Sequence, residues 1–418
     1  MLKRTGKYDQ YHDREPAECK PSRRIRKGRI AAVLAIIGGI AIGIWFLIVA
    51  KSCAEAEIER PQEFLIERRA VNILGDAEIG YIPRESPRPL SIEPVVLKYD
   101  RDRIAAKIPR NRKGEPLIGP SVLVDYDSLR ILWSYRSGEV GQIASMTKMM
   151  LLYVTYALVD SGAISLFDTV YVTDEAPLMG GSQAYLDRGE RYTVSQLLGA
   201  VAICSANDAA YLLADYIGCL NDSDAVGVAE GVKLINDFAE RLGLEQTKFF
   251  NAHGLPPARS WKEIIEDGIA KQRYKRRDII VATKANTSTP IEMAKLGIAL
   301  CKYPRLLRYT NVVAADFWDA DSARVYGSYR MNNHFKPIAS MDIDGIKTGY
   351  TSGAGYCVTA SAERRGRRLI AVVFGAKTQN LRDDFVVELF ETAFDSLGLL
   401  PDSVALDSTT ISDTAGGE

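Results

Sequence analysis

Two residues in the middle of the chain could together perform acyl transfer. Ser145-Met-Thr-Lys148 sets a hydroxyl and an amine three positions apart, and on a helix this spacing places both on one face, one turn apart. A hydroxyl is a weak nucleophile until a nearby base takes its proton, and a lysine in a desolvated pocket can be that base. We therefore take Ser145 as the candidate nucleophile and Lys148 as its general base. Alone, the motif is more typical of a helix N-cap followed by a solvated lysine.

A second motif, Ser205-Ala-Asn207, offers two polar side chains that could assist the first pair. The Ser205 hydroxyl could relay a proton to the leaving group. The Asn207 amide could hold a substrate carbonyl or orient Lys148. By itself this motif also has the composition of a helix N-cap.

A third motif, Lys347-Thr348-Gly349, is expected on a strand that lines the same site. Lys347 supplies positive charge and Thr348 a hydroxyl for a substrate carboxylate, whereas Gly349 allows a ligand backbone to approach closely. The backbone N–H groups of Ser145 and Tyr350 are candidates for an oxyanion hole.

The surrounding patterns predict the elements that would hold these motifs. Residues 121–126 and 130–135 are β-rich and joined by a short polar turn, which is typical of a hairpin. Helical periodicity follows over 145–159, 193–202, 208–216, 228–242 and 290–302, and strand patterns return at 355–362 and 368–375 before an amphipathic helix that contains residues 385–397. Strands at both ends with helices between them predict an α/β (α+β) fold: an antiparallel sheet flanked by helices, with an inserted helical subdomain.

The N-terminal region reads as a membrane attachment. Residues 1–29 are basic and resemble a cytoplasmic arm, and residues 30–50 are apolar without a charge. About 20 residues suffice to span a bilayer as a helix, and basic residues on the N-terminal side place that end in the cytoplasm. We expect a retained single-pass anchor, with the catalytic domain outside the cytoplasm (periplasmic); the alternative is a signal peptide cleaved near Ala54.

The rest of the chain divides into three parts. Residues 51–116 are charged and proline-rich and read as an extracytoplasmic spacer, with one short helix over 61–74. Residues 117–400 form the predicted catalytic domain, and 401–418 a disordered tail. The formal net charge is zero, so nothing points to nucleic acid. The cysteines lack metal spacing, so we expect buried free thiols, no metal and no cofactor.

The order of the three motifs matches the penicillin-recognising serine enzymes. Further segments carry the resemblance, namely 143–150, 179–183, 205–209, 250–255, 344–351 and 354–357. Over about 119–399 the chain resembles the serine D-Ala-D-Ala carboxypeptidase family, the low-molecular-mass penicillin-binding proteins. The resemblance implies a transpeptidase/β-lactamase-like fold, a peptidoglycan stem peptide ending in D-Ala-D-Ala as substrate, and penicillins as covalent inhibitors. It also implies that an arginine after the last strands, Arg382, helps to receive the terminal carboxylate.

Several alternatives stay open at this stage. A transpeptidase or endopeptidase would use the same residues, because only the acceptor or the bond differs. A class A β-lactamase is disfavoured because the expected glutamate before a Leu-Asn pair is absent between the second and third motifs. A non-catalytic wall-binding module would have lost a motif residue. A Ser-His-Asp hydrolase has only His12, His253 and His334 to draw on, and we read His253 as structural.

One stretch departs from the resemblance. Residues 258–285 are longer and more basic than the family's usual connection, with Lys271, Arg273, Lys275, Arg276 and Arg277. They could contact anionic glycan strands or lipid, but we expect an ordinary solvated loop.

Overall fold

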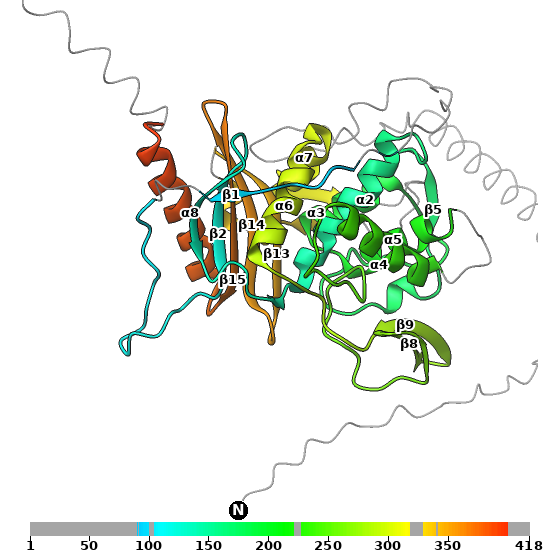
Figure 1. The fold of residues 1–418 in the computed structure, drawn as a ribbon. Helices are drawn as coiled ribbons and strands as arrows, with labels where there is room; N and C mark the ends of the chain where they lie inside the picture. The colour runs from blue at the N-terminus through cyan, green and yellow to red at the C-terminus, as the bar shows by residue number, and fades with distance from the viewer. Residues whose placement is uncertain are drawn as a thin grey trace, which may run out of the picture. The chain divides into compact units, whose positions relative to one another are not determined.

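A computed structural model gives the fold of the globular part of the chain (Figure 1). The residues that it describes are 90, 92–99, 104–220, 227–317, 329–339 and 342–399. The predicted arm, membrane helix, short helix over 61–74 and tail lie outside the described residues. Among the described helices, none combines the length and the apolar character that crossing a bilayer requires.

A six-stranded sheet in the order β1-β3-β2-β15-β14-β13 forms the centre of the fold. Its strands are β1 (Lys98–Tyr99), β2 (Ser121–Asp125), β3 (Arg130–Tyr135), β13 (Ile343–Thr351), β14 (Gly355–Arg364) and β15 (Arg367–Ala376). All neighbours are antiparallel except β1, which runs parallel to β3. The predicted hairpin, the two C-terminal strands and the closure of the sheet by both ends of the domain are confirmed.

Strand β15 explains why the sheet is covered on both faces. Ile370 and Val372 face the core shared with the helices, whereas Ala371 and Val373 face the core beneath α8 (Gln379–Ser396). Alternate side chains of a strand point to opposite faces, so a strand that is apolar throughout requires packing on both sides. Figure 1 shows α8 on one side of the sheet and the other helices on the opposite side.

The helices that follow the first hairpin build the inserted subdomain. They are α2 (Lys148–Asp160), α3 (Val194–Ile203), α4 (Asn207–Gly218), α5 (Gly227–Arg241), α6 (Pro290–Cys301) and α7 (Pro304–Thr310), with 3-10 turns η1 (Ala144–Thr147), η2 (Ala176–Leu178) and η3 (Lys336–Ala339). Helix α3 starts where expected because Thr193 and Gln196 form a reciprocal capping box. Thr289 caps α6, and Pro290 takes the first helical position, where no backbone N–H is needed.

Small sheets complete the subdomain. They comprise β4 (Gly141–Gln142) with β10 (Thr287–Ser288), β5 (Thr169–Tyr171) with β6 (Arg191–Thr193), β11 (Ala314–Phe317) with β12 (Tyr329–Asn332), and the three strands β7 (Glu263–Glu266), β8 (Ile269–Tyr274) and β9 (Arg277–Ala282).

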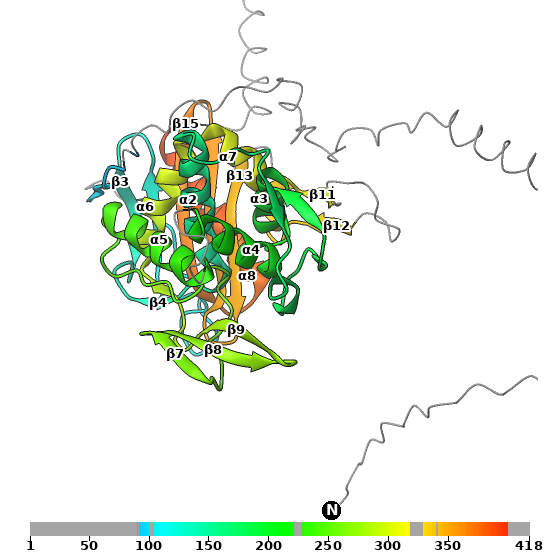
Figure 2. The ribbon, with the colours of Figure 1, turned by 90° about the vertical axis from the view of Figure 1, so that its right-hand side faces the viewer.

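The expectation of a solvated loop over 258–285 is wrong, because the β7–β9 sheet occupies most of this stretch (Figure 2). Backbone pairing from Ile269↔Ala282 to Tyr274↔Arg277 satisfies the polar groups that a loop would leave to water. Charged residues interrupt the apolar alternation here, so the sequence lacks a clear strand pattern.

The described part of the predicted spacer contacts the sheet. Strand β1 pairs with β3, and Ile104 N donates to Leu132 O at 3.1 Å. The Trp133 indole Nε1 donates to Ala106 O at 3.1 Å, and Val95 is 4% exposed in the main core. Residues well before Gly119 therefore contribute to the packing of the folded unit.

Candidate active site

Ser145 lies in η1, the 3-10 turn that leads into α2. The preceding residue, Ala144, has φ of +46°, a left-handed conformation that is uncommon for a residue with a side chain. The turn sits on β13: a Cβ at Gly349 would lie 2.6 Å from Ile143 O and 3.1 Å from Ser145 N. Gly349 is thus required by the close approach of the chain's own backbone, a different reason from the ligand approach that we expected.

Lys148 is fully buried beside Ser145, with its Nζ 3.1 Å from Ser145 Oγ. Nζ donates to Asn207 Oδ1 at 2.7 Å and to the backbone carbonyl of His253 at 2.5 Å. A neutral amine has two N–H bonds and one lone pair. With both N–H groups on these two acceptors, the lone pair is left for the serine hydroxyl, which is the geometry that a general base needs.

Electrostatics favour the neutral form of Lys148. Burial holds the pKa of its amine well below the usual range, and the nearby Lys347 lowers it further. Burial also lowers the pKa of the His253 imidazole to about 3, with Lys148 as a second cause. His253 therefore adds no charge, and its Nδ1 accepts from Leu255 N at 3.1 Å. This agrees with a structural role for its side chain.

Asn207 connects Lys148 to the rim of the site. Its Nδ2 donates to Gly180 O at 2.6 Å, which fixes the amide orientation that presents Oδ1 to the lysine. Its backbone N–H donates to Ser182 O at 2.7 Å. The next residue, Asp208, accepts from Ala184 N at 3.0 Å. The start of α4 therefore holds both the general base and the 180–184 segment.

Ser205 has a buried hydroxyl without a hydrogen-bond partner among the described residues. Its φ is +61°, a second left-handed position at this site. Buried polar atoms in proteins are nearly always paired, and strained backbone is concentrated at functional sites. An unpaired hydroxyl that lines a cavity is available to a bound molecule.

A cavity of about 350 Å³ joins the motifs. It is lined by Ser145, Ser182, Ser205, His334, Thr348, Gly349, Tyr350, Tyr356, Gln379 and Arg382. Lys148 and Lys347 lie behind this lining, 0% and 4% exposed. The structure thus brings together every residue that the sequence predicted for the site, from η1, α2, the turn between α3 and α4, α4, β13 and α8.

Lys347 differs from expectation in its charge. Burial lowers the pKa of its amine to about 7, and Arg382 contributes in the same direction. The amine donates to Thr348 O at 3.3 Å. Its positive charge is therefore only partly present at neutral pH until an anion binds nearby.

Arg382 lies within the first turn of α8, rather than in the segment before the helix as we expected. Its guanidinium donates to Asp383 Oδ1 at 2.6 and 2.8 Å, to Cys357 O at 3.4 Å and to His334 O at 3.3 Å. These contacts fix its position at the cavity and share part of its charge with Asp383.

Several residues at the site lie outside the three motifs. The carbonyl of His253 is one, and Ser182, His334, Tyr356 and Gln379 are others. The rings of Tyr350 and Tyr356 lie 4.3 Å apart at the cavity. A signal existed for Ser182, His253 and Tyr356, because the segments 179–183, 250–255 and 354–357 carry the family resemblance.

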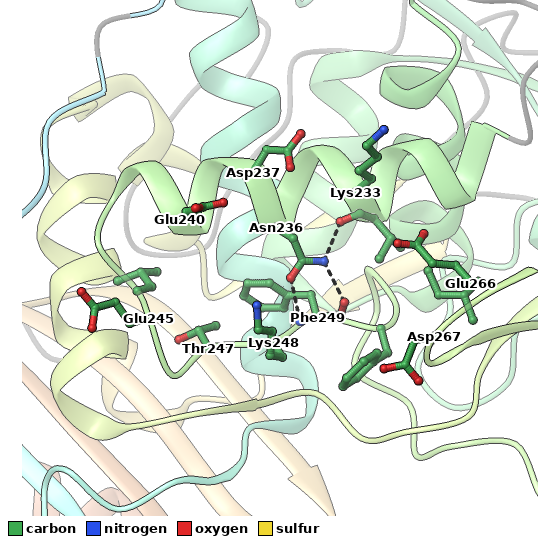
Figure 3. Close-up of a pocket in the computed structure, with 14 residues that line it drawn as sticks. Lys233, Asn236, Asp237, Glu240, Glu245, Thr247, Lys248, Phe249, Glu266 and Asp267 are labelled. Atoms are coloured by element: carbon green, nitrogen blue, oxygen red, sulfur yellow. Dashed lines mark hydrogen bonds between the residues drawn. The ribbon is translucent and has the colours of Figure 1, made fainter.

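A second, larger cavity of about 750 Å³ lacks this chemistry (Figure 3). It lies between α5, residues 244–250 and the β7–β8 turn. Asn236 bridges its floor, donating to Val232 O and Phe249 O at 2.9 and 2.8 Å. The one hydroxyl among the described residues that line it, that of Thr247, is 2% exposed and already hydrogen-bonded to Glu292 and Ser288, so the smaller cavity is the candidate active site.

Comparison with known proteins decides the family. The D-alanyl-D-alanine carboxypeptidase family, peptidase S11, matches residues 118–378. The chain belongs to this family. DacF of Bacillus subtilis, a D-alanyl-D-alanine carboxypeptidase, is 32% identical over 66% of the chain and 61% of its own length. DacC of Escherichia coli, with the same description, is 30% identical over 62% of the chain and 57% of its own length. The chain thus spans less than two thirds of these S11 relatives.

Solved structures agree on the fold of this S11 member. Penicillin-binding protein 6B of E. coli superposes with a TM-score of 0.56 at 26% identity, covering 71% of the chain and 81% of that protein. A variant of the Streptomyces K15 DD-transpeptidase gives a TM-score of 0.55 at 21% identity, covering 67% and 98%. The transpeptidase fold predicted from the motifs is confirmed.

Proposed function

We propose that the chain is a serine D-alanyl-D-alanine carboxypeptidase that removes the terminal D-Ala from peptidoglycan stem peptides. The observation that carries the proposal is the arrangement around Lys148. A buried amine of lowered pKa has both N–H groups engaged and Ser145 Oγ at 3.1 Å. Membership of the S11 family supports the substrate.

The first half of the proposed reaction forms an acyl-enzyme. As Ser145 Oγ attacks the carbonyl carbon of the D-Ala-D-Ala bond, its proton passes to the Lys148 amine. The carbonyl oxygen becomes an oxyanion, which the N–H groups of Ser145 and Tyr350 would stabilise. The C–N bond then breaks, and the Ser205 hydroxyl relays the proton from Lys148 to the departing D-Ala nitrogen.

The second half releases the shortened stem. A water molecule gives its proton to Lys148 and attacks the ester carbon, after which the proton returns to Ser145 Oγ as the ester bond breaks. No step needs a metal or a cofactor, since the serine and the lysine supply the nucleophile and the base.

The substrate's terminal carboxylate would bind at the opposite wall of the cavity. Thr348 offers a hydroxyl, Arg382 a guanidinium fixed by Asp383, and Lys347 an amine that gains charge when the anion binds. An anion near a buried amine raises its pKa, so carboxylate binding and protonation of Lys347 favour each other. This coupling would select a peptide with a free C-terminus.

The same arrangement supports covalent inhibition by β-lactams. A related protein of the same fold, penicillin-binding protein D2 of Listeria monocytogenes, is described in an ampicillin-bound form. None of the residues that line this cavity in the described part of the chain carries a carboxylate. We therefore expect the penicilloyl ester on Ser145 to be hydrolysed slowly, because Lys148 is the base at the ester and no carboxylate in the cavity lining is placed to assist it in activating water. The second candidate is transfer of the acyl group to an amine, as a transpeptidase performs. Water and an amine would both reach the ester on Ser145 through this cavity, so the same residues would serve either acceptor.

We further propose that residues 30–50 anchor the protein as a single-pass membrane helix, with the catalytic domain outside the cytoplasm. The support is the uncharged apolar run and the basic residues before it. An anchored domain would stay next to the wall that contains its substrate. Treatment of cells with a protease that cannot cross the cytoplasmic membrane tests the orientation. The catalytic domain should be digested if it lies outside that membrane, and it should stay intact if it lies in the cytoplasm.

Release of D-alanine from a peptide ending in D-Ala-D-Ala tests the activity. The wild-type chain should release D-alanine, and Ser145→Ala should release none. Ser396→Ala removes an exposed hydroxyl at the end of α8 and should behave as wild type. D-alanine release by Ser145→Ala at the wild-type rate would refute the assignment of the nucleophile.

A further inference from the structure

The insert between the second and third motifs is attached directly to the catalytic turn at both ends. On its entry side, the His253 carbonyl accepts from Lys148 Nζ, and a Cβ at Gly254 would lie 2.0 Å from Ala144 O. On its exit side, Asn286 Nδ2 donates to Thr147 Oγ1 at 2.8 Å. The insert therefore projects from the active site itself rather than from a remote surface.

The β7–β9 sheet also contacts the rim of the cavity from the side. Arg277 of β9 pairs with Asp174 at 3.0 Å and donates to its carbonyl at 3.2 Å. Asp174 precedes η2 and the Gly180–Ser182 segment, whose carbonyls hold Asn207. In Figures 1 and 2 the sheet lies at the end of the molecule opposite to α7.

The sheet has opposite charges at its two ends. Glu266 and Asp267 lie at the β7–β8 turn, where they line the larger cavity (Figure 3), whereas Glu263 begins β7 and pairs with Lys271 at 3.7 Å. At the other end are the side chains that we call the basic tip: Trp261, Lys262, Arg273, Tyr274, Lys275 and Arg276. Strands of this length separate the two ends by roughly 15–20 Å, which is beyond the screening length of about 8 Å in physiological salt.

The basic tip is exposed and carries an excess of positive charge. Asp278 pairs with both Lys262 and Arg273 at 3.2 Å, so its single negative charge neutralises only one of their two positive charges. Within the described residues, Lys275 and Arg276 have no ion-pair partner, although Lys275 lies over the Tyr274 ring at 5.4 Å. Trp261 is 45% exposed.

The turn at the basic tip conflicts with the local preference of its residues. Lys275 and Arg276 have φ of +43° and +72°, and a hairpin turn of this kind favours Asn-Gly. Such conflicts between local preference and structure are expected where function selects the residues. Here they place two free cations at the outermost point of the insert.

We propose that the basic tip is a docking surface for polymeric substrate, a chain that carries many stems with free carboxylates. This inference rests on the proposed function, since each uncleaved stem ends in a carboxylate and a strand with many stems is a polyanion. Positive charge beside the site raises the local concentration of such a strand and its association rate. The exposed rings of Trp261 and Tyr274 provide flat apolar surface for its sugars or peptides.

Charge reversal at the outermost point tests the proposal. The full chain in neutral detergent is assayed with soluble uncross-linked strands and with a short blocked peptide that ends in D-Ala-D-Ala. Lys275→Glu/Arg276→Glu should lower kcat/KM for the strands about tenfold at low salt, and raising the salt should diminish the loss. The kcat/KM for the short peptide should stay within about twofold, since one charge is steered far less than many.

Lys302→Glu/Arg305→Glu is the matched control, because Lys302 caps the C-terminus of α6 and Arg305 lies in the first turn of α7, and both are exposed at the opposite end of the molecule. This control variant should have the wild-type kcat/KM for both substrates. The proposal would be overturned if the tip variant lost kcat/KM equally on both substrates. It would also be overturned if the ratio of kcat/KM for the strands to kcat/KM for the short peptide were the same as in wild type. If this ratio is unchanged but the tip variant associates more weakly with anionic mixed micelles, the basic tip binds lipid and not the polymeric substrate.

Binding of the soluble substrate strands can be measured without catalysis, so it tests the docking surface independently of the proposed enzymatic activity. Fluorescence anisotropy of labelled strands with the Ser145→Ala chain needs no turnover. Loss of strand affinity in the tip variant of this chain supports the docking surface even if the wild type releases no D-alanine. Unchanged affinity would overturn it whatever the activity.

Discussion

The substitution Asn207→Asp tests the role of Lys148 by turning the neutral amide that contacts its amine into a carboxylate. Asn207 Oδ1 lies 2.7 Å from Lys148 Nζ, so the variant places a carboxylate against the buried base. At an effective dielectric constant of about 20, a unit charge at this distance stabilises the ammonium by about 6 kcal/mol, or about 4.5 pKa units. Burial of the new carboxylate opposes part of this, and we expect a rise of about two units in the pKa of Lys148.

The sign of the effect on activity follows from the base mechanism. Only neutral Lys148 can take the proton of Ser145, so the rate constant of acylation rises with pH through the pKa of the amine. In Asn207→Asp this rise should move about two pH units higher than in wild type. At a pH below both values, the acylation rate constant should therefore fall about 100-fold.

The assay is the pH dependence of acylation by a fluorescent penicillin under single-turnover conditions. Asn207→Ala is the control without added charge: like Asn207→Asp it loses the donation to Gly180 O, and it also removes the acceptor for Lys148 Nζ. Its rate constant should fall, but its profile should not move to higher pH. A profile of Asn207→Asp that superimposes on the wild-type profile would refute the assignment of Lys148 as the base.

Three further predictions follow from contacts around the site. The Lys347 pKa of about 7 implies that KM for a peptide with a free carboxylate rises as pH increases through 7; Lys347→Arg, which stays charged, should remove this dependence, and a persistent dependence would point to another group. Gly349→Ala brings a Cβ to 2.6 Å from Ile143 O and should lower the free energy of unfolding by about 1–3 kcal/mol, measured by denaturant unfolding; an unchanged midpoint would contradict the close approach. Arg364→Ala leaves Glu391 and Asp342 without their shared partner and should cost about 2 kcal/mol by the same measurement, since these acids are only partly buried.

The sequence predicted the parts of the fold that depend on regular patterns. The alternation in 121–126 and 130–135 identified the β2–β3 hairpin, and periodicity located α3, α4 and α6 within one or two residues. The motifs at Ser145 and Lys347 were placed correctly on a helix start and a strand. These features are local, so short windows contain the information that specifies them.

Features that depend on contacts between distant segments were not predictable in this way. The carbonyl of His253 orients Lys148, yet every residue has a carbonyl and no side-chain pattern marks this one. The lowered pKa of Lys347 arises from burial that only the assembled sheet and helices create. The β7–β9 sheet was missed because Glu263 and Glu266 flank two isoleucines and leave no alternating pattern.

Covalent labelling at a single residue tests the central claim most directly. The full chain is incubated with penicillin, its intact mass is measured, and the modified peptide is sequenced by mass spectrometry. We predict one penicilloyl group per chain, attached to Ser145, and none in Ser145→Ala. An adduct on another residue, or one that persists in Ser145→Ala, would contradict the assignment of Ser145 as the nucleophile.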